Sequence, residues 1–210
     1  MRSLSFRLVS ECIRLLSGAL ACSALLFGCS TNGSASSSVA LAPAAAGHTE
    51  AVDKKIKIRN NAASLLEQLL DEDKNVGKIL IIKHGSRDLS GLIKAISTVA
   101  ADGAKRLKGL AQSDPTLDLT RQELPVGEKA SRDAVGKTEE HDLLFSSGAD
   151  FEFTLLLTQA QALNYGSHLA KVAGDNSADS NEADAFLSMS RTLNQLLIQV
   201  KAIMRSLPSK

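Results

Sequence analysis

The chain has 210 residues, with 24 basic and 23 acidic side chains and a formal net charge of +1. This balance gives no basic surface of the kind that binds nucleic acid. Aromatic residues make up 3% of the chain, with one tyrosine and no tryptophan. An aromatic cage for a cation or a stacking platform for bases therefore lacks its side chains, and we expect no nucleic-acid partner.

The first 28 residues have the order of a secretory signal. Arg2, Arg7 and Arg14 precede the apolar run 15–27, and Gly28 and Cys29 follow it. This order resembles the bacterial lipoprotein signal, in which a small residue precedes a cysteine that is acylated on sulfur and becomes the mature N-terminus. The resemblance implies that residues 1–28 are a signal peptide, that Cys29 is the lipid attachment site, and that the lipid holds the protein on a membrane.

Alternatives remain at this end of the chain. An uncleaved membrane helix is one, but an apolar stretch of about fourteen residues is short for a bilayer core that needs roughly twenty. Plain secretion is another, and Cys22 is a second possible acylation site with a shorter apolar run before it. Because Ser30 and not aspartate follows Cys29, the segment resembles lipoproteins sent to the outer membrane. We expect the outer membrane, facing the periplasm, with the inner membrane or the cell surface as alternatives.

The cysteines narrow the chemistry of the mature protein. Cys12 and Cys22 lie in the expected signal and Cys29 carries the expected lipid, so no thiol is left for the mature domain. Disulfides within the domain, CxxC redox chemistry and thiolate metal sites are thereby excluded. Removing residues 1–28 takes away three arginines and one glutamate, which leaves a net charge near −1.

Small and polar residues with a proline interruption fill residues 29–53, which predicts a lipidated flexible tether. Residues 54–210 are long enough for one domain with its own core. Apolar residues recur there at helical spacing, in four stripes that must bury one another, so we predict an all-α helical bundle. The stripes lie at 62–70, 89–110, 155–170 and 186–204.

Turn and capping residues predict where these helices begin and end. Acidic residues 71–73 favour a helix start, and the β-branched segment 76–82 is predicted helical with a strand as the alternative. Gly85 predicts the end of one helix, and Ser86 predicts the N-cap of the next. The remaining expected boundaries are an end at 113–115, a shorter helix at 128–145, a break at 146–148 and a loop at 174–180.

The order of these elements resembles a family. Leu124-Pro125 after the second long helix, and a Gly-x-x-Phe entry (Gly148 to Phe151) into the third, resemble the periplasmic ferritin-like proteins of unknown function that are often labelled outer-membrane proteins. The resemblance covers about residues 56–205. It implies a ferritin-like up-down bundle with extra short helices, and it implies no activity.

A metal centre of the ferritin type is not expected. It would need Glu-x-x-His pairs, whose spacing aims both ligands at the bundle axis, and the chain has none. The related family often carries an Asp-His pair and a further histidine, where this chain has Asp102-Gly103 and Ala162 or Leu163. His84 is favoured as a cation at a helix C-terminus, and residues 139–142 with His141 are favoured as a solvated face. His168 lies near the end of the third long helix. We therefore expect no metal, no cofactor and no catalytic residues.

Gln159 falls on an apolar stripe, so it is either a buried amide that bridges two helices or a polar contact in a ligand pocket with Phe151 and Phe153. The bridge is favoured. The sequence as a whole predicts an envelope lipoprotein with a non-enzymatic interaction or structural bundle and a protein partner in the envelope. The alternatives are a periplasmic carrier of a small molecule or lipid, and a metal-binding ferritin-like enzyme.

Overall fold

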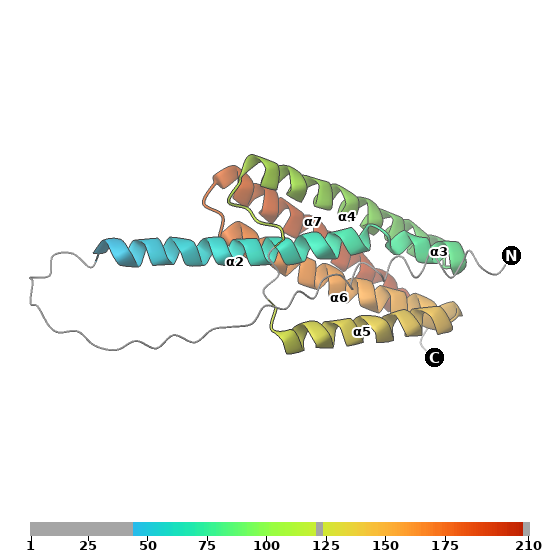
Figure 1. Ribbon diagram of the computed structural model, residues 1–210. Coiled ribbons are helices and arrows are strands. Elements are labelled where there is room, and N and C mark those ends of the chain that lie inside the picture. Colours follow the sequence, from blue (N-terminus) through green and yellow to red (C-terminus); the bar gives the residue numbers. More distant parts are fainter. Residues whose placement is uncertain (1–43, 121–123, 208–210) are drawn as a thin grey trace, which may run out of the picture. The chain divides into compact units, whose positions relative to one another are not determined.

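A computed structural model describes residues 44–120 and 124–207. Throughout these ranges the regular elements are helices, as expected (Figure 1). The long helices are α2 (Ala44–Asp73), α4 (Arg87–Ser113), α5 (Val126–Phe145), α6 (Gly148–Asp175) and α7 (Ser180–Ser206). Two short elements, η2 (Val76–Lys78) and α3 (Ile79–Ile82), join α2 to α4. The chain from Val52 onward forms one compact unit.

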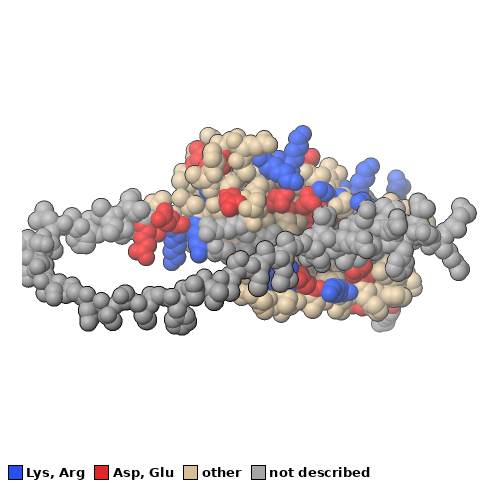
Figure 2. Space-filling view, in the orientation of Figure 1, with Lys and Arg blue, Asp and Glu red and all other residues tan. Residues whose placement is uncertain are grey.

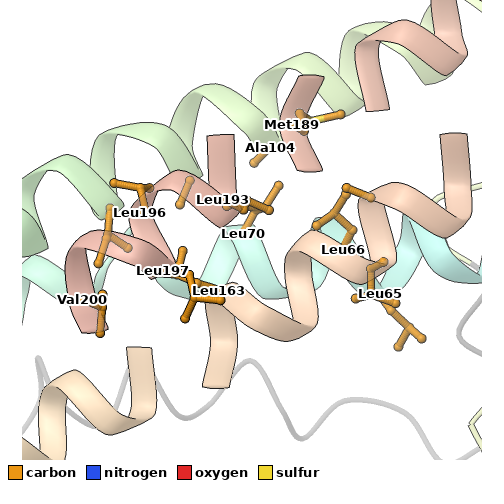
Figure 3. Close-up of a cluster of buried hydrophobic side chains, with 14 of the residues drawn as sticks. Leu65, Leu66, Leu70, Ala104, Leu163, Met189, Leu193, Leu196, Leu197 and Val200 are labelled. Atoms are coloured by element: carbon orange, nitrogen blue, oxygen red, sulfur yellow. The ribbon is translucent and has the colours of Figure 1, made fainter. Parts of the chain in front are cut away.

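The four predicted stripes meet in a common core, which confirms the bundle. Helices α6 and α7 pack against each other as a hairpin, and α4 packs on α7. Figure 3 shows Leu70 of α2 beside Leu193 of α7, and Leu163 of α6 beside Leu197 of α7. These four residues and Leu66 of α2 are buried members of one core cluster. No one of these helices could bury its apolar face alone.

Two glycines let α2 approach its neighbours closely. A Cβ atom on Gly103 of α4 would lie 2.9 Å from Leu70 Cδ1, and one on Gly166 of α6 would lie 2.8 Å from Leu69 Cδ2. Both distances are shorter than real Cβ contacts. The leucines of α2 therefore occupy space that any other residue at 103 or 166 would fill.

Helix α5 is more exposed than the rest of the bundle and has no fully buried residue. It packs on α6, where Arg132 donates a hydrogen bond to the hydroxyl of Tyr165 at 2.9 Å. The guanidinium also lies over the tyrosine ring, 4.7 Å from its centroid. This contact between Tyr165 and Arg132 helps hold α5 against α6.

Most predicted boundaries are confirmed. Ser86 is the N-cap of α4, and its Oγ accepts the Leu89 amide at 3.3 Å. Helix α4 ends at Ser113, α5 ends just before the predicted break, and the last loop joins α6 to α7. Gly148 begins α6 with a φ of 57°, a left-handed conformation that glycine adopts without strain.

Two boundary predictions are wrong. Residues 71–73 end α2 and do not start a helix, because the apolar stripe of α2 continues to Leu70. Residues 44–53, expected to belong to the tether, are the first turns of α2. The tether prediction relied on missing apolar periodicity, whereas alanine and lysine favour helix without it. The expected signal 1–28 and Cys29 lie outside the described residues.

Candidate functional site

The pocket expected at Gln159, Phe151 and Phe153 does not form. Phe151 is 1% exposed and belongs to the core, whereas Phe153 is 48% exposed. Residues two apart on a helix point about 200° away from each other, so the two rings cannot line one cavity. That prediction is corrected: of the three residues, Gln159 remains as a buried polar group.

The described surface includes grooves of two sizes that could admit a ligand. One of about 520 Å³ lies where the start of α4 meets the end of α7, against Arg87, Gly91 and Ile203. The other, about 210 Å³, opens above Gly103 and Met189 and is smaller than the roughly 300 Å³ at which small-molecule sites begin. Neither lining includes a histidine or a cysteine, whereas the smaller groove is lined by Asp102, Ser188 and Thr192.

Gln159 is a buried amide, 5% exposed, on the core side of α6. That it bridges two helices stays a prediction. Its Oε1 atom has no hydrogen-bond partner within the described structure. Burying a carbonyl oxygen without a hydrogen-bond donor lowers the free energy of unfolding.

The carboxyl groups at the end of α2 bind protons more tightly than usual. Loss of hydration, helped by the charge of Glu72 and opposed in part by Gln159, raises the pKa of Asp73 to about 7. Loss of hydration also raises the pKa of Glu72, against a hydrogen bond from Gln68 and together with the charges of Asp71 and Asp133. Asp73 therefore exchanges its proton near neutral pH.

A second polar cluster surrounds Arg59, where α2 meets the end of α4 and the start of α7. Arg59 Nη1 donates to Asp114 Oδ2 at 2.9 Å and to Glu182 Oε2 at 3.0 Å. Its Nη2 donates to Thr116 Oγ1 at 2.9 Å, and its Nε donates to Asn60 Oδ1 at 3.1 Å. Asn60 in turn donates to the carbonyl of Thr116 at 2.8 Å. Four partners thus hold one buried guanidinium.

The acidic partners of Arg59 differ in their surroundings. Glu182 is buried in the first turn of α7, behind its N-cap Asp179, and its Oε1 is the other buried side-chain oxygen without a partner in the described ranges. Asp114 is more open. Partial desolvation raises the pKa of Asp114, but hydrogen bonds from Thr116 and the charge of Arg59 outweigh it and lower the pKa overall. The cluster therefore links α2, the end of α4 and the start of α7.

Sequence reasoning missed the Arg59 cluster, although a signal for it existed. Arg59 occupies the same helical face as Ala63, Leu66 and Leu70, all of which are buried. A charged residue on a core stripe needs a buried partner. The spacing could therefore have predicted an ion pair at Arg59, but not that Glu182 would supply it.

The histidines do not converge. His141 lies 3.5 Å from the carboxylate of its neighbour Asp142 and stacks on Phe145 with ring centroids 4.5 Å apart, on the exposed side of α5. No group of three or more metal-ligating side chains occurs in the ranges 44–120 and 124–207. Figure 2 shows that basic and acidic side chains are interspersed on the visible face, with no large region of one sign.

None of the helices described here is long and apolar enough to span a bilayer. Comparisons with protein-family models, curated proteins and solved structures find no match to this chain. Function must therefore be argued from the residues themselves.

Proposed function

We propose that this chain is a bacterial envelope lipoprotein, anchored through Cys29, whose helical bundle is a non-enzymatic interaction module for another envelope protein. The signal-like order of residues 1–28 supports the anchor, since the acylated cysteine would begin the mature chain. The bundle is proposed to have the ferritin-like arrangement, with two helix pairs on either side of the connection between α4 and α6. The observation that carries the interaction role lies on α2.

The core stripe of α2 continues beyond the bundle. Val52 and Ile56 share a helical face with Arg59, Ala63 and Leu66, which are buried. Yet Val52 is 45% exposed and Ile56 is half-buried, while the other residues from 50 to 58 are solvent-exposed. The face that the bundle covers from residue 59 onward is thus only partly covered over the two turns before it. An open apolar helical face of this kind suits a groove or helix of a protein partner.

The anchor is tested by lipid labelling in cells. Cys29→Ala should abolish incorporation of labelled palmitate and leave the protein unprocessed or soluble. Cys22→Ala is the control and should label as the natural chain does. Continued labelling of the Cys29→Ala protein would contradict the anchor.

The interaction is tested with a photo-crosslinking residue at Val52 in the lipidated protein. Light should give a discrete adduct with an envelope protein, and Ile56→Asp, which places a charge on the same face, should remove that adduct. Ile198 on α7 is the matched control, since it is also an exposed aliphatic residue. Equal adducts at Val52 and Ile198, or no adduct at Val52, would count against the proposal.

A further inference from the structure

The smaller groove lies where α4 and α7 meet, and its floor is apolar. Buried or half-buried side chains of three helices form the floor: Leu70 of α2, Val99 of α4, and Met189 and Leu193 of α7. The groove has a volume of about 210 Å³. Since one water occupies about 30 Å³ of liquid, this volume suits a ligand of about seven non-hydrogen atoms. The groove is thus too small for a drug-sized molecule and large enough for a small metabolite.

Two opposite charges lie on the α4 side of this groove. Asp102 and Arg106 are solvent-exposed, line the groove and stand one helical turn apart. Aspartate and arginine at this spacing often pair with each other. Here neither side chain has an ion pair or hydrogen bond within the ranges that the structure describes. Both charges are therefore available to a ligand in the groove.

Two hydroxyl groups line the α7 side. Ser188 and Thr192 are half-buried and also stand one turn apart. Thr192 Oγ1 donates to the carbonyl oxygen of Ser188 at 3.1 Å, so its proton is in use and its oxygen can only accept from a ligand. The Ser188 hydroxyl has no hydrogen-bond partner among the described residues. It can donate its proton to a ligand.

The directions of the two helices decide which hydroxyl lies opposite which charge. The larger groove joins residues 87–95 of α4 to residues 199–203 of α7, and the smaller groove joins 99–106 to 188–193. Later residues of α4 thus meet earlier residues of α7, so the helices run antiparallel here. This register places Asp102 toward Thr192 and Arg106 toward Ser188. One end of the groove then offers acceptors, and the other end offers donors.

We infer that this groove binds a small zwitterion, namely an α-amino acid with a short aliphatic side chain. An ammonium group has three donors and no acceptor, which matches the carboxylate of Asp102 and the oxygen of Thr192. A carboxylate has acceptors only, which matches the guanidinium of Arg106 and the hydroxyl of Ser188. The aliphatic side chain lies on the apolar floor, where the flexible Met189 can adapt to its shape.

The first test uses L-valine, added to the full chain purified in detergent and followed by NMR. The backbone amides of Gly103, Ser188 and Thr192 should shift to saturation. Isobutylamine is valine without its carboxylate, and isovalerate is valine without its ammonium group. Each should bind about fivefold more weakly or worse, because one contact to an exposed charge is missing. Absence of saturable shifts with valine, or equal binding of all three compounds, overturns the inference.

The second test asks whether each charge binds the expected end of the ligand. Asp102→Asn should weaken valine binding about fivefold or more and leave isovalerate binding unchanged. Arg106→Gln should weaken valine binding equally and leave isobutylamine binding unchanged. Both positions are solvent-exposed, so the bundle should fold in either variant.

Matched controls lie on the same two helices. Lys105→Gln on α4 and Asp184→Asn on α7 remove exposed charges that do not line the groove, and both should bind valine as the natural chain does. Losses of the same size in the control variants would overturn the inference. So would an Asp102→Asn protein that loses isovalerate binding as strongly as valine binding.

The groove is separate from the α2 face on which the proposed function depends. Valine binding requires neither the lipid at Cys29 nor a partner at Val52. If the photo-crosslink at Val52 fails while valine binds as described, the interaction role falls and the amino-acid site remains. If valine fails to bind while the crosslink forms, the site falls and the interaction role remains.

Discussion

Arg59 and Glu182 are separated by 123 residues in the sequence and form an ion pair of 3.0 Å in the fold. The arginine comes from the middle of α2 and the glutamate from the first turn of α7, and both side chains are buried. The pair therefore fixes which turn of α2 lies against the start of α7. It also marks where α2 leaves the bundle, since exposed turns precede it.

Replacing the arginine should be costly. Arg59→Met leaves the buried Glu182 carboxylate without its cation, and breaking one side of a buried pair costs about 3 to 5 kcal/mol. The double variant Arg59→Met, Glu182→Leu should recover much of this loss, because a buried pair replaced by apolar residues is often tolerated. Urea unfolding of the natural chain, the single variants Arg59→Met and Glu182→Leu, and the double variant checks this. A double variant as unstable as the sum of the single variants would show that the pair is not one unit.

Leu196 tests the rotation of α7. It is buried beside the core leucines, so Leu196→Ala should cost about 2 to 5 kcal/mol of unfolding free energy. Ile198, two residues on, is 61% exposed, and Ile198→Ala should change the free energy by no more than about 0.5 kcal/mol. The same loss at both positions, measured by chemical denaturation, would mean that α7 presents a different face to the core.

The glycines of the bundle provide a paired test of close packing. A Cβ atom at Gly166 would lie 2.8 Å from Leu69 Cδ2 and 3.3 Å from Leu193 Cδ1, so Gly166→Ala should destabilise the fold by about 1 to 3 kcal/mol. At Gly109 of α4 a Cβ atom meets nothing within 4 Å. Gly109→Ala should therefore stabilise the fold, by about 0.5 to 1 kcal/mol. Melting temperatures that move in the same direction for both would contradict this packing.

The helices were predictable because their signals are local. The spacing of apolar residues predicts the buried stripes. Serine is a common N-cap residue, so Ser86 predicts the start of α4. The first turns of α2 were not predictable in this way, because they bury no stripe and form by intrinsic propensity. The end of α2 was misplaced for a related reason: acidic residues 71–73 favour a helix start, but the packing of Leu70 extends α2 into them.

For the polar groups of the core, the spacing of residues along a helix predicts burial but not the hydrogen-bond partners. The spacing places Arg59 on a buried face, but its partners Asp114 and Glu182 come from elements that meet only in the fold. The Gln159 amide was correctly placed among buried residues. The proposed pocket failed because Phe151 and Phe153 lie on opposite sides of one helix.

The exposed turns of α2 have a consequence for a chain held, as proposed, by a lipid on Cys29. Helical backbone opens most readily where few side chains cover it, and Lys54 and Lys55 lie in those turns. A protease that cuts after lysine would reach them sooner than the buried turns that follow. Cleavage there leaves the Arg59 cluster whole and separates the bundle from the proposed anchor at Cys29. One cut would then release a folded domain from the membrane.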